Sequence, residues 1–249
     1  MKNYIKTAVV MLTLMLQAGV CGRAAEPAGQ KPDWITGHLE IGTRTTYFQL
    51  QDQHRDFLGG DRFYGSINEL DVQQIYLPLK VFVAYKVNPY WGVELTAEKL
   101  SVETWSRPNP QDAPPWTDGT INLMGPVFSV FARYPNSTRL TPYAGVGAAY
   151  FFADFDADPA WHHPADKREY DPTFYQDFKL DNSLAWLGYV GLMINLNDNW
   201  ALDFMARYMA MDVDGVTLTK HGGSDYYENG TFTFPMKNIS YGVGLRYMF

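Results

Sequence analysis

The last eleven residues, ISYGVGLRYMF (residues 239–249), alternate between two kinds of side chain. Large apolar side chains stand at every second position from Ile239 to Phe249, and mostly small or polar residues stand between them. A period of two over this length predicts a β-strand with one apolar face. Chain ends usually fray and are polar, so a pattern that reaches the last residue predicts a strand built into a sheet.

The same alternation returns along the rest of the chain. Seven further segments show it, and with residues 236–249 they make eight expected strands. They lie at residues 37–50, 74–87, from Trp91 onward, and at 121–134, 141–153, 184–196 and 200–212.

The connections between these segments alternate in length. Those after the second, fourth and sixth segments are short, and those after the first, third, fifth and seventh are long, about 15 to 27 residues. A soluble sandwich or lipocalin-like barrel needs no such alternation, whereas outer-membrane barrels combine an even strand number with short periplasmic turns and long outer loops. The prediction is an all-β, eight-stranded antiparallel up-and-down transmembrane β-barrel in the outer membrane of a Gram-negative-type bacterium.

Aromatic residues support a membrane environment. NPYWGVELTAE (88–98) and NDNWALDFMAR (197–207) match in register, which places Trp91 and Trp200 just above two periplasmic turns. Tyr85, Tyr134, Tyr247 and Phe249 fall near the same level. Such rings form the aromatic girdle of outer-membrane barrels. The alternative, an aromatic core in a soluble sandwich, leaves the loop lengths unexplained.

The first residues predict a secretory signal. Lys2 and Lys6 precede an apolar run at 8–16, and small residues follow near 22–25. We therefore expect a signal peptide at 1–25 and a single barrel domain at 26–249. Removal of the signal peptide would change the formal net charge from −7 to −10 and leave no cysteine, since Cys21 is the only one. An acidic exported chain argues against a nucleic-acid partner.

Four blocks resemble the outer membrane protein W family: YWGVELTAEKL (90–100), LTPYAGVGAAYFFADF (140–155), NSLAWLGYVGLMINLNDNWALDFMARYMAMDVD (182–214) and ISYGVGLRYMF (239–249). Their order and spacing agree with that family from about Trp91 to Phe249, whereas the first strand is less similar. The resemblance implies an eight-stranded barrel with a narrow apolar channel that passes or binds small hydrophobic molecules. The terminal Tyr247 and Phe249 also resemble the signal read by the outer-membrane barrel assembly machinery.

Alternation assigns charged residues to the lower lumen. Four acids and four bases are expected there: Glu40, Glu94, Glu98 and Asp203 with Arg44, Lys80, Arg207 and Arg246. Buried charges require partners, so these residues are expected to form a salt-bridge network that plugs the barrel, with Arg207 bonded to Asp203 or a nearby glutamate. Two interpretations stay open, a purely structural plug and the floor of a ligand pocket.

The upper lumen is expected to be apolar and to hold the ligand pocket. Its predicted lining is Phe48, Tyr76, Leu100, Leu187, Tyr189, Met209 and Met211. A barrel of this size is filled by side chains or holds one small ligand, which argues against a general porin. Thioethers and aromatic rings adapt to apolar ligands. The sequence therefore favours a narrow channel or pocket for small hydrophobic molecules, and the alternative is a structural or loop-displaying barrel.

Two prolines lie inside expected strands. Pro78 and Pro126 each remove a ladder hydrogen bond. They mark either strand ends or bulges near the outer rim, or a gap through which an apolar ligand passes sideways into lipid.

No catalytic, cofactor or metal site is predicted. His162, His163 and His221 lie in expected loops without ligand spacing, and residues 154–158 lack the glycine and final glutamate of a calcium loop. A lipid-modifying enzyme would need a serine, a histidine and an acid together near the outer rim. The expected partners are therefore outer-membrane lipids, small hydrophobic molecules and the assembly machinery.

Overall fold

The computed structural model describes residues 35–51, 69–72, 80–106, 116–163, 165–222 and 227–249. The predicted signal peptide, Tyr76 and Pro78 lie outside these residues. The strands are β1 (Leu39–Leu50), β2 (Glu69–Val72), β3 (Lys80–Lys86), β4 (Trp91–Ser106), β5 (Trp116–Arg133), β6 (Leu140–Ala157), β7 (Tyr175–Leu180), β8 (Ser183–Asn195), β9 (Trp200–Ala210), β10 (Asp212–Lys220), β11 (Tyr227–Pro235) and β12 (Asn238–Met248). Two short helices, α2 (Pro159–His162) and α3 (Ala165–Tyr170), lie between β6 and β7.

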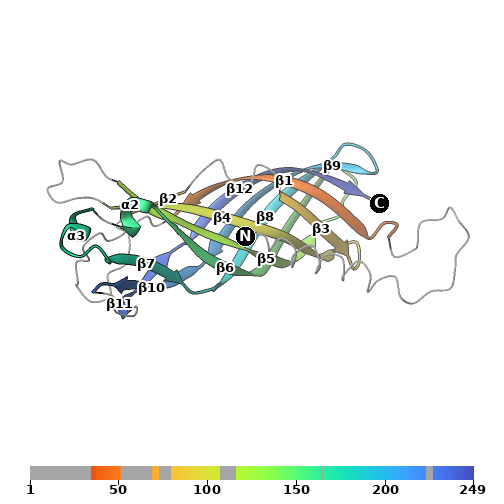
Figure 1. Cartoon of the computed structure of the whole chain (residues 1–249). Helices are drawn as coiled ribbons and strands as arrows, with labels where there is room; N and C mark the ends of the chain where they lie inside the picture. Colours follow the sequence, from red (N-terminus) through yellow and green to blue (C-terminus); the bar gives the residue numbers. More distant parts are fainter. Residues whose placement is uncertain (1–34, 52–68, 73–79, 107–115, 164, 223–226) are drawn as a thin grey trace, which may run out of the picture.

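The strands close into an antiparallel barrel, which confirms the predicted fold class (Figure 1). Around the barrel the order is β1, β3, β4, β5, β6, β8, β9 and β12. The last strand pairs with the first from Glu40 opposite Met248 to Leu50 opposite Asn238. Strands β2 and β3 both pair with β4, at its outer and inner ends respectively, and so share one position in the wall. Closure removes the free edges that lipid would penalise.

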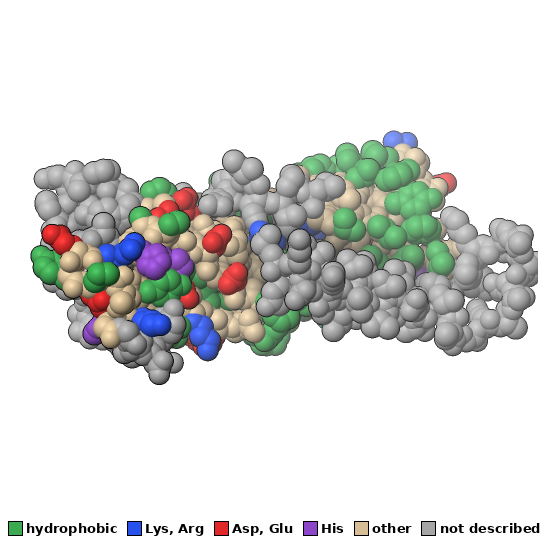
Figure 2. Space-filling view, in the orientation of Figure 1, with side chains coloured by type: hydrophobic (Ala, Val, Ile, Leu, Met, Phe, Trp, Pro, Cys, Tyr) green, Lys and Arg blue, Asp and Glu red, His purple; other side chains and the backbone are tan. Residues whose placement is uncertain are grey.

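Alternation along each strand separates a buried lumen from an apolar outer surface. Phe128, Val146 and Trp186 are 52% to 67% exposed on the outside, while their sequence neighbours face inward and are buried or largely so. Figure 2 shows hydrophobic side chains covering the barrel at one end of the molecule, with charges gathered at the other. An apolar surface of this extent requires lipid contact.

The aromatic residues at the periplasmic end lie as predicted. Trp91 begins β4 and Trp200 begins β9, both beside short turns. The Trp200 ring contacts Tyr247 edge-on at 4.9 Å between centroids, and Tyr247 contacts Phe249 in the same way at 4.8 Å. These contacts form part of a girdle at the inner boundary of the membrane.

The outer end differs from the sequence prediction. The segments expected to be long loops include β7, β10 and β11, which form a second sheet in the order β11–β10–β7. Strands β4 and β5 also stay paired as far as Ser106 opposite Trp116. The connection between these two strands is therefore shorter than expected. The second sheet is stabilised by an aromatic core beyond the barrel, where the Phe178 ring lies 5.4 Å from Phe155 and 5.6 Å from Phe234.

In the part of the chain that is described, no helix is both long and apolar enough to cross a membrane.

Candidate functional site

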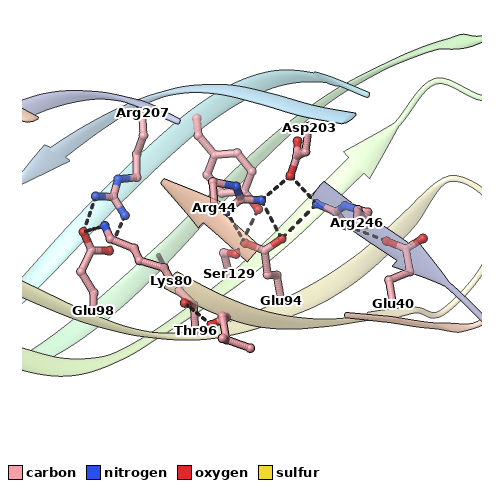
Figure 3. Close-up of polar contacts among 12 residues, drawn as sticks. Glu40, Arg44, Lys80, Glu94, Thr96, Glu98, Ser129, Asp203, Arg207 and Arg246 are labelled. Carbon is pink, nitrogen blue, oxygen red and sulfur yellow. Dashed lines mark hydrogen bonds and ion pairs between the residues drawn. The ribbon is translucent and has the colours of Figure 1, made fainter. Parts of the chain in front are cut away.

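All eight charged residues predicted for the lumen lie inside the barrel, and none is more than 6% exposed. They are Glu40, Arg44, Lys80, Glu94, Glu98, Asp203, Arg207 and Arg246. The period of two places them there because each stands at the inward position of its strand. Figure 3 shows that they separate along the barrel axis into two groups.

The larger group, the lower ion cluster, consists of Glu40, Arg44, Glu94, Arg133, Asp203 and Arg246. Arg246 joins its three acids, with guanidinium nitrogens 2.6 Å from Glu40, 3.0 Å from Asp203 and 3.3 Å from Glu94 (Figure 3). Arg44 reaches Glu94 at 3.0 Å and Asp203 at 2.6 Å. These pairs connect β1, β4, β9 and β12, so they tie the walls of the barrel together.

Arg133 belongs to this cluster although the sequence analysis did not identify it. Its two terminal nitrogens donate to the two oxygens of Glu40 at 2.6 and 2.5 Å, a bidentate geometry that strengthens the pair. Lys86 approaches the same carboxylate at 3.6 Å. Arg133 stands in phase with the inward positions 121 to 131 of β5. Alternation would therefore have found it, had the last residues of that strand been assigned to a face.

Tyr143 is a second residue that the sequence analysis missed. Its hydroxyl donates to Asp203, whose other oxygen accepts from Arg44. The ring lies against Gly191, where an added Cβ would be 2.1 Å from the Tyr143 ring. Glycine at this position is required by the close approach of the ring. No sequence signal distinguishes an inward tyrosine that orients a carboxylate from one that packs.

The second group, the upper ion cluster, consists of Lys80, Glu98 and Arg207. Arg207 donates from both terminal nitrogens to the two Glu98 oxygens at 2.6 Å, and from Nε to the Ser240 hydroxyl at 3.1 Å. Lys80 Nζ donates to Glu98 at 2.7 Å. Of the two partners predicted for Arg207, the nearby glutamate is the one observed. Asp203 pairs instead with Arg44 and Arg246.

Two phenylalanine rings lie against the cations. Phe82 lies 4.3 Å from the Arg44 guanidinium and 4.6 Å from that of Arg246, measured to the ring centroid. Phe48 lies 4.2 Å from Lys80 Nζ and 5.6 Å from the Arg207 guanidinium. Desolvated cation–π contacts of this kind stabilise the positive charges. They also exclude water from the ion clusters.

The predicted pocket residues form part of a buried apolar core. Phe48, Leu100, Leu187, Tyr189, Met209 and Met211 are each at most 7% exposed, and Tyr76 lies outside the described residues. Tyr189 lies lower than predicted, because it stands opposite Arg207 and its hydroxyl is 3.0 Å from that of Ser129. The core continues outward through Met236 and Phe234 to Trp161, residues that the sequence analysis did not include.

Of the paired histidines, His162 is less solvated than predicted, whereas His163 is exposed. His162 Nδ1 lies 2.6 Å from the Gln176 carbonyl, and its ring stacks on Tyr175 at 4.7 Å. They therefore help to join α2 to β7. Within the described ranges, no group of three or more His, Cys, Asp or Glu side chains has the arrangement of a metal site.

Comparison with known proteins places this geometry in context. Residues 76–249 match a family model described as outer membrane protein beta-barrel domain. The structure of OprG from Pseudomonas aeruginosa is 18% identical with a TM-score of 0.64, over 86% of this chain and 96% of that chain. AlkL, solved in lipid bilayers, is 15% identical with a TM-score of 0.55, over 92% and 97%. Outer membrane protein W of E. coli is 18% identical with a TM-score of 0.40, over 86% and 98%.

No curated protein matches the chain by sequence. OprG and AlkL are members of the outer membrane protein W family. Their similarity confirms, at the level of the fold, the resemblance that the sequence indicated. At these identities the likeness concerns the barrel and not its ligand.

Proposed function

This chain belongs to the family of outer membrane protein beta-barrel domains, and we propose that it is a narrow channel or binding pocket for small hydrophobic molecules. It is a small β-barrel of the outer membrane of a Gram-negative-type bacterium. In the proposed pathway an apolar molecule enters from the outside, binds in the upper lumen and leaves sideways into the lipid. We propose no catalytic activity. The proposal includes a signal peptide at 1–25 and one mature domain at 26–249.

The observation that carries the proposal is the division of the lumen along its axis. Below, nine side chains from both ion clusters are joined by ion pairs of 2.5 to 3.3 Å. Above them the lumen is lined by apolar side chains such as Met209 and Leu187. An apolar ligand entering from outside is stabilised by burial there. It is stopped by the ions below, because separating a buried pair is strongly unfavourable.

A sideways exit is supported by an irregularity in the wall between β5 and β6. Their pairing runs to Met124 opposite Phe152 and resumes at Val127 opposite Ala149. Gly125 and Pro126 lie in the interruption, and Pro126 has no N–H to donate. Fewer ladder bonds lower the free energy of opening the wall at this point.

One observation favours the alternative, a structural or loop-displaying barrel. The upper lumen residues are buried against one another and continue into the core of the outer sheet. A barrel whose lumen is filled in this way needs no ligand for its stability. The two functions differ in whether the Met-rich upper core opens to admit an apolar molecule.

Binding to the purified barrel in lipid nanodiscs distinguishes them. The parent protein is expected to bind the apolar fluorophore N-phenyl-1-naphthylamine above the background of empty nanodiscs. Met209→Glu is expected to weaken this binding at least about tenfold, since it would place a charged carboxylate where the apolar probe lies. Lys237→Glu, at an exposed position outside the barrel, is the matched control and should bind as the parent does.

Gel mobility with and without heating reports whether each variant forms a barrel. A parent protein that binds no probe, or a folded Met209→Glu variant that binds as tightly as the parent, would favour the structural barrel. Single-channel conductance tests the closure of the lower lumen separately from ligand binding. The ion pairs that fill this part of the barrel predict no stable ion-conducting pore.

A further inference from the structure

The two ion clusters differ in their balance of charge. Among buried side chains, the lower ion cluster holds three carboxylates, Glu40, Glu94 and Asp203, against three guanidinium groups, Arg44, Arg133 and Arg246. Lys86, which lies 3.6 Å from Glu40, is 22% exposed, so solvent screens its charge. In the upper ion cluster one carboxylate holds two cations, since both Lys80 and Arg207 bond to Glu98. Among the described residues no second acid pairs with either cation, so this cluster has one excess positive charge.

The excess charge is buried. The side chains of Lys80 and Arg207 are each 5% exposed and that of Glu98 is 1% exposed. A buried charge without a counterion is unfavourable, because the surrounding medium screens it poorly. The Phe48 ring offsets part of this unfavourable free energy through its contact with Lys80 at 4.2 Å. A ring face carries no net charge, so the cluster becomes neutral only if Lys80 loses its proton or if one negative charge binds beside it.

The surroundings restrict what could bring that charge. Following the inward positions outward, Leu100 stands two residues beyond Glu98 on β4, and Met209 stands two residues beyond Arg207 on β9. Phe48 on β1 lies at the same height in the lumen, opposite Ser240 on β12, and contributes a third apolar side chain. The cluster is therefore a cationic floor beneath apolar walls, and it lies at the outward-facing side of the ion clusters (Figure 3). Hydrated inorganic anions do not suit apolar walls, whereas an amphiphile with one anionic end does.

We infer that the upper ion cluster binds the carboxylate head group of an amphiphilic molecule whose alkyl tail lies in the apolar upper lumen. This inference rests on the proposed function, since it requires that the upper lumen admit an apolar chain. The carboxylate accepts charge-assisted hydrogen bonds from Lys80 and Arg207, and its single charge balances the cluster. The ligand class is thereby narrowed from hydrophobic molecules in general to alkyl carboxylates.

The test compares decanoate with decanol, which share an alkyl chain and differ in the head group. Equilibrium dialysis with radiolabelled probes measures binding to the barrel in phosphatidylcholine nanodiscs at neutral pH, after subtraction of binding to empty nanodiscs. The parent protein should bind decanoate at least about tenfold more tightly than decanol, as expected for hydrogen bonds to a charged group.

Lys80→Met is the decisive variant, because it leaves Glu98 and Arg207 as a balanced pair. The preference for decanoate should disappear. Lys237→Met makes the same change in net charge at an exposed position and should retain the preference. Lys80→Gln provides a second, polar replacement should the methionine variant fail to form a heat-modifiable barrel.

The outcomes separate this inference from the proposed function. Equal binding of decanoate and decanol by the parent would refute the carboxylate site and leave apolar binding intact. Binding of neither probe would refute both. A preference for decanoate that persists in a folded Lys80 variant would refute the role of the upper ion cluster. Failure of both variants to fold would show that the excess cation has a structural role, which also refutes the inference.

Discussion

Replacing Arg246 by methionine should destabilise the barrel more than replacing any other cation of the ion clusters. Arg246 is 1% exposed and is the only described residue that contacts all three acids of the lower ion cluster. Methionine retains much of the apolar stem that packs near Phe82 and removes the charge. The change therefore isolates the electrostatic contribution from most of the packing.

The magnitude follows from the charges that remain. Without Arg246, Glu40 keeps Arg133 and the partly exposed Lys86. Glu94 and Asp203 then share Arg44 alone, so one of these two buried carboxylates has no counterion. Removing one partner of a buried ion pair costs about 3–5 kcal/mol. Lys80→Met is the matched comparison, because it removes a cation from the upper ion cluster and leaves Glu98 paired with Arg207. That variant should change the free energy of unfolding by less than about 1 kcal/mol.

Equilibrium unfolding in urea in lipid vesicles measures both values. Seven tryptophans report the transition by fluorescence, and none is part of either ion cluster. A double-mutant cycle of Arg246→Met with Asp203→Asn, a pair at 3.0 Å, isolates their interaction. The reasoning would be refuted by a loss below about 1 kcal/mol for Arg246→Met, or by strictly additive effects in the cycle.

Four further predictions concern single residues. Phe249→Glu should block assembly into the membrane while export continues, as measured by the heat-modifiable barrel in membrane fractions; normal assembly would exclude Phe249 as part of the assembly signal. Gly191→Ala should cost about 1–3 kcal/mol in urea unfolding, because its Cβ would overlap the Tyr143 ring, and no loss would mean that the ring moves freely. Tyr143→Phe should cost about 1–3 kcal/mol through the lost bond to Asp203, with an unchanged unfolding midpoint as the contrary result. Pro126→Ala should slow transfer of an apolar fluorophore from outside into the surrounding lipid without weakening its binding, and unchanged transfer would argue against an exit beside β5.

Alternation made the wall of the barrel predictable. A strand has only two faces, so a period of two assigns every inward and outward residue once one of them is known. This is why Glu94, Asp203 and Arg246 could be placed in the lumen before any tertiary structure was available. The same rule would have placed Arg133, had it been followed to the end of its strand.

The outer sheet was not predictable in this way. Residues 212–220 and 227–235 contain Asp, Asn, Gly and Thr at densities typical of loops, and residues 175–180 are too short for their alternation to stand out. They form strands because Phe178, Phe232 and Phe234 pack together with Trp161 and Phe155 above the barrel. Such contacts join residues from separate connections, and no local pattern records them.

By itself, the sequence determined that the chain crosses the outer membrane as eight strands, which residues face the lumen, and that the charges there must find partners. Only the tertiary structure decided which charges are partners. Closing the barrel brings residues as distant as Glu40 and Arg246 to 2.6 Å, and it sets the height of each side chain through strand register. The physical reason is that strand alternation is local, whereas the division into one balanced and one unbalanced cluster depends on distances across the lumen.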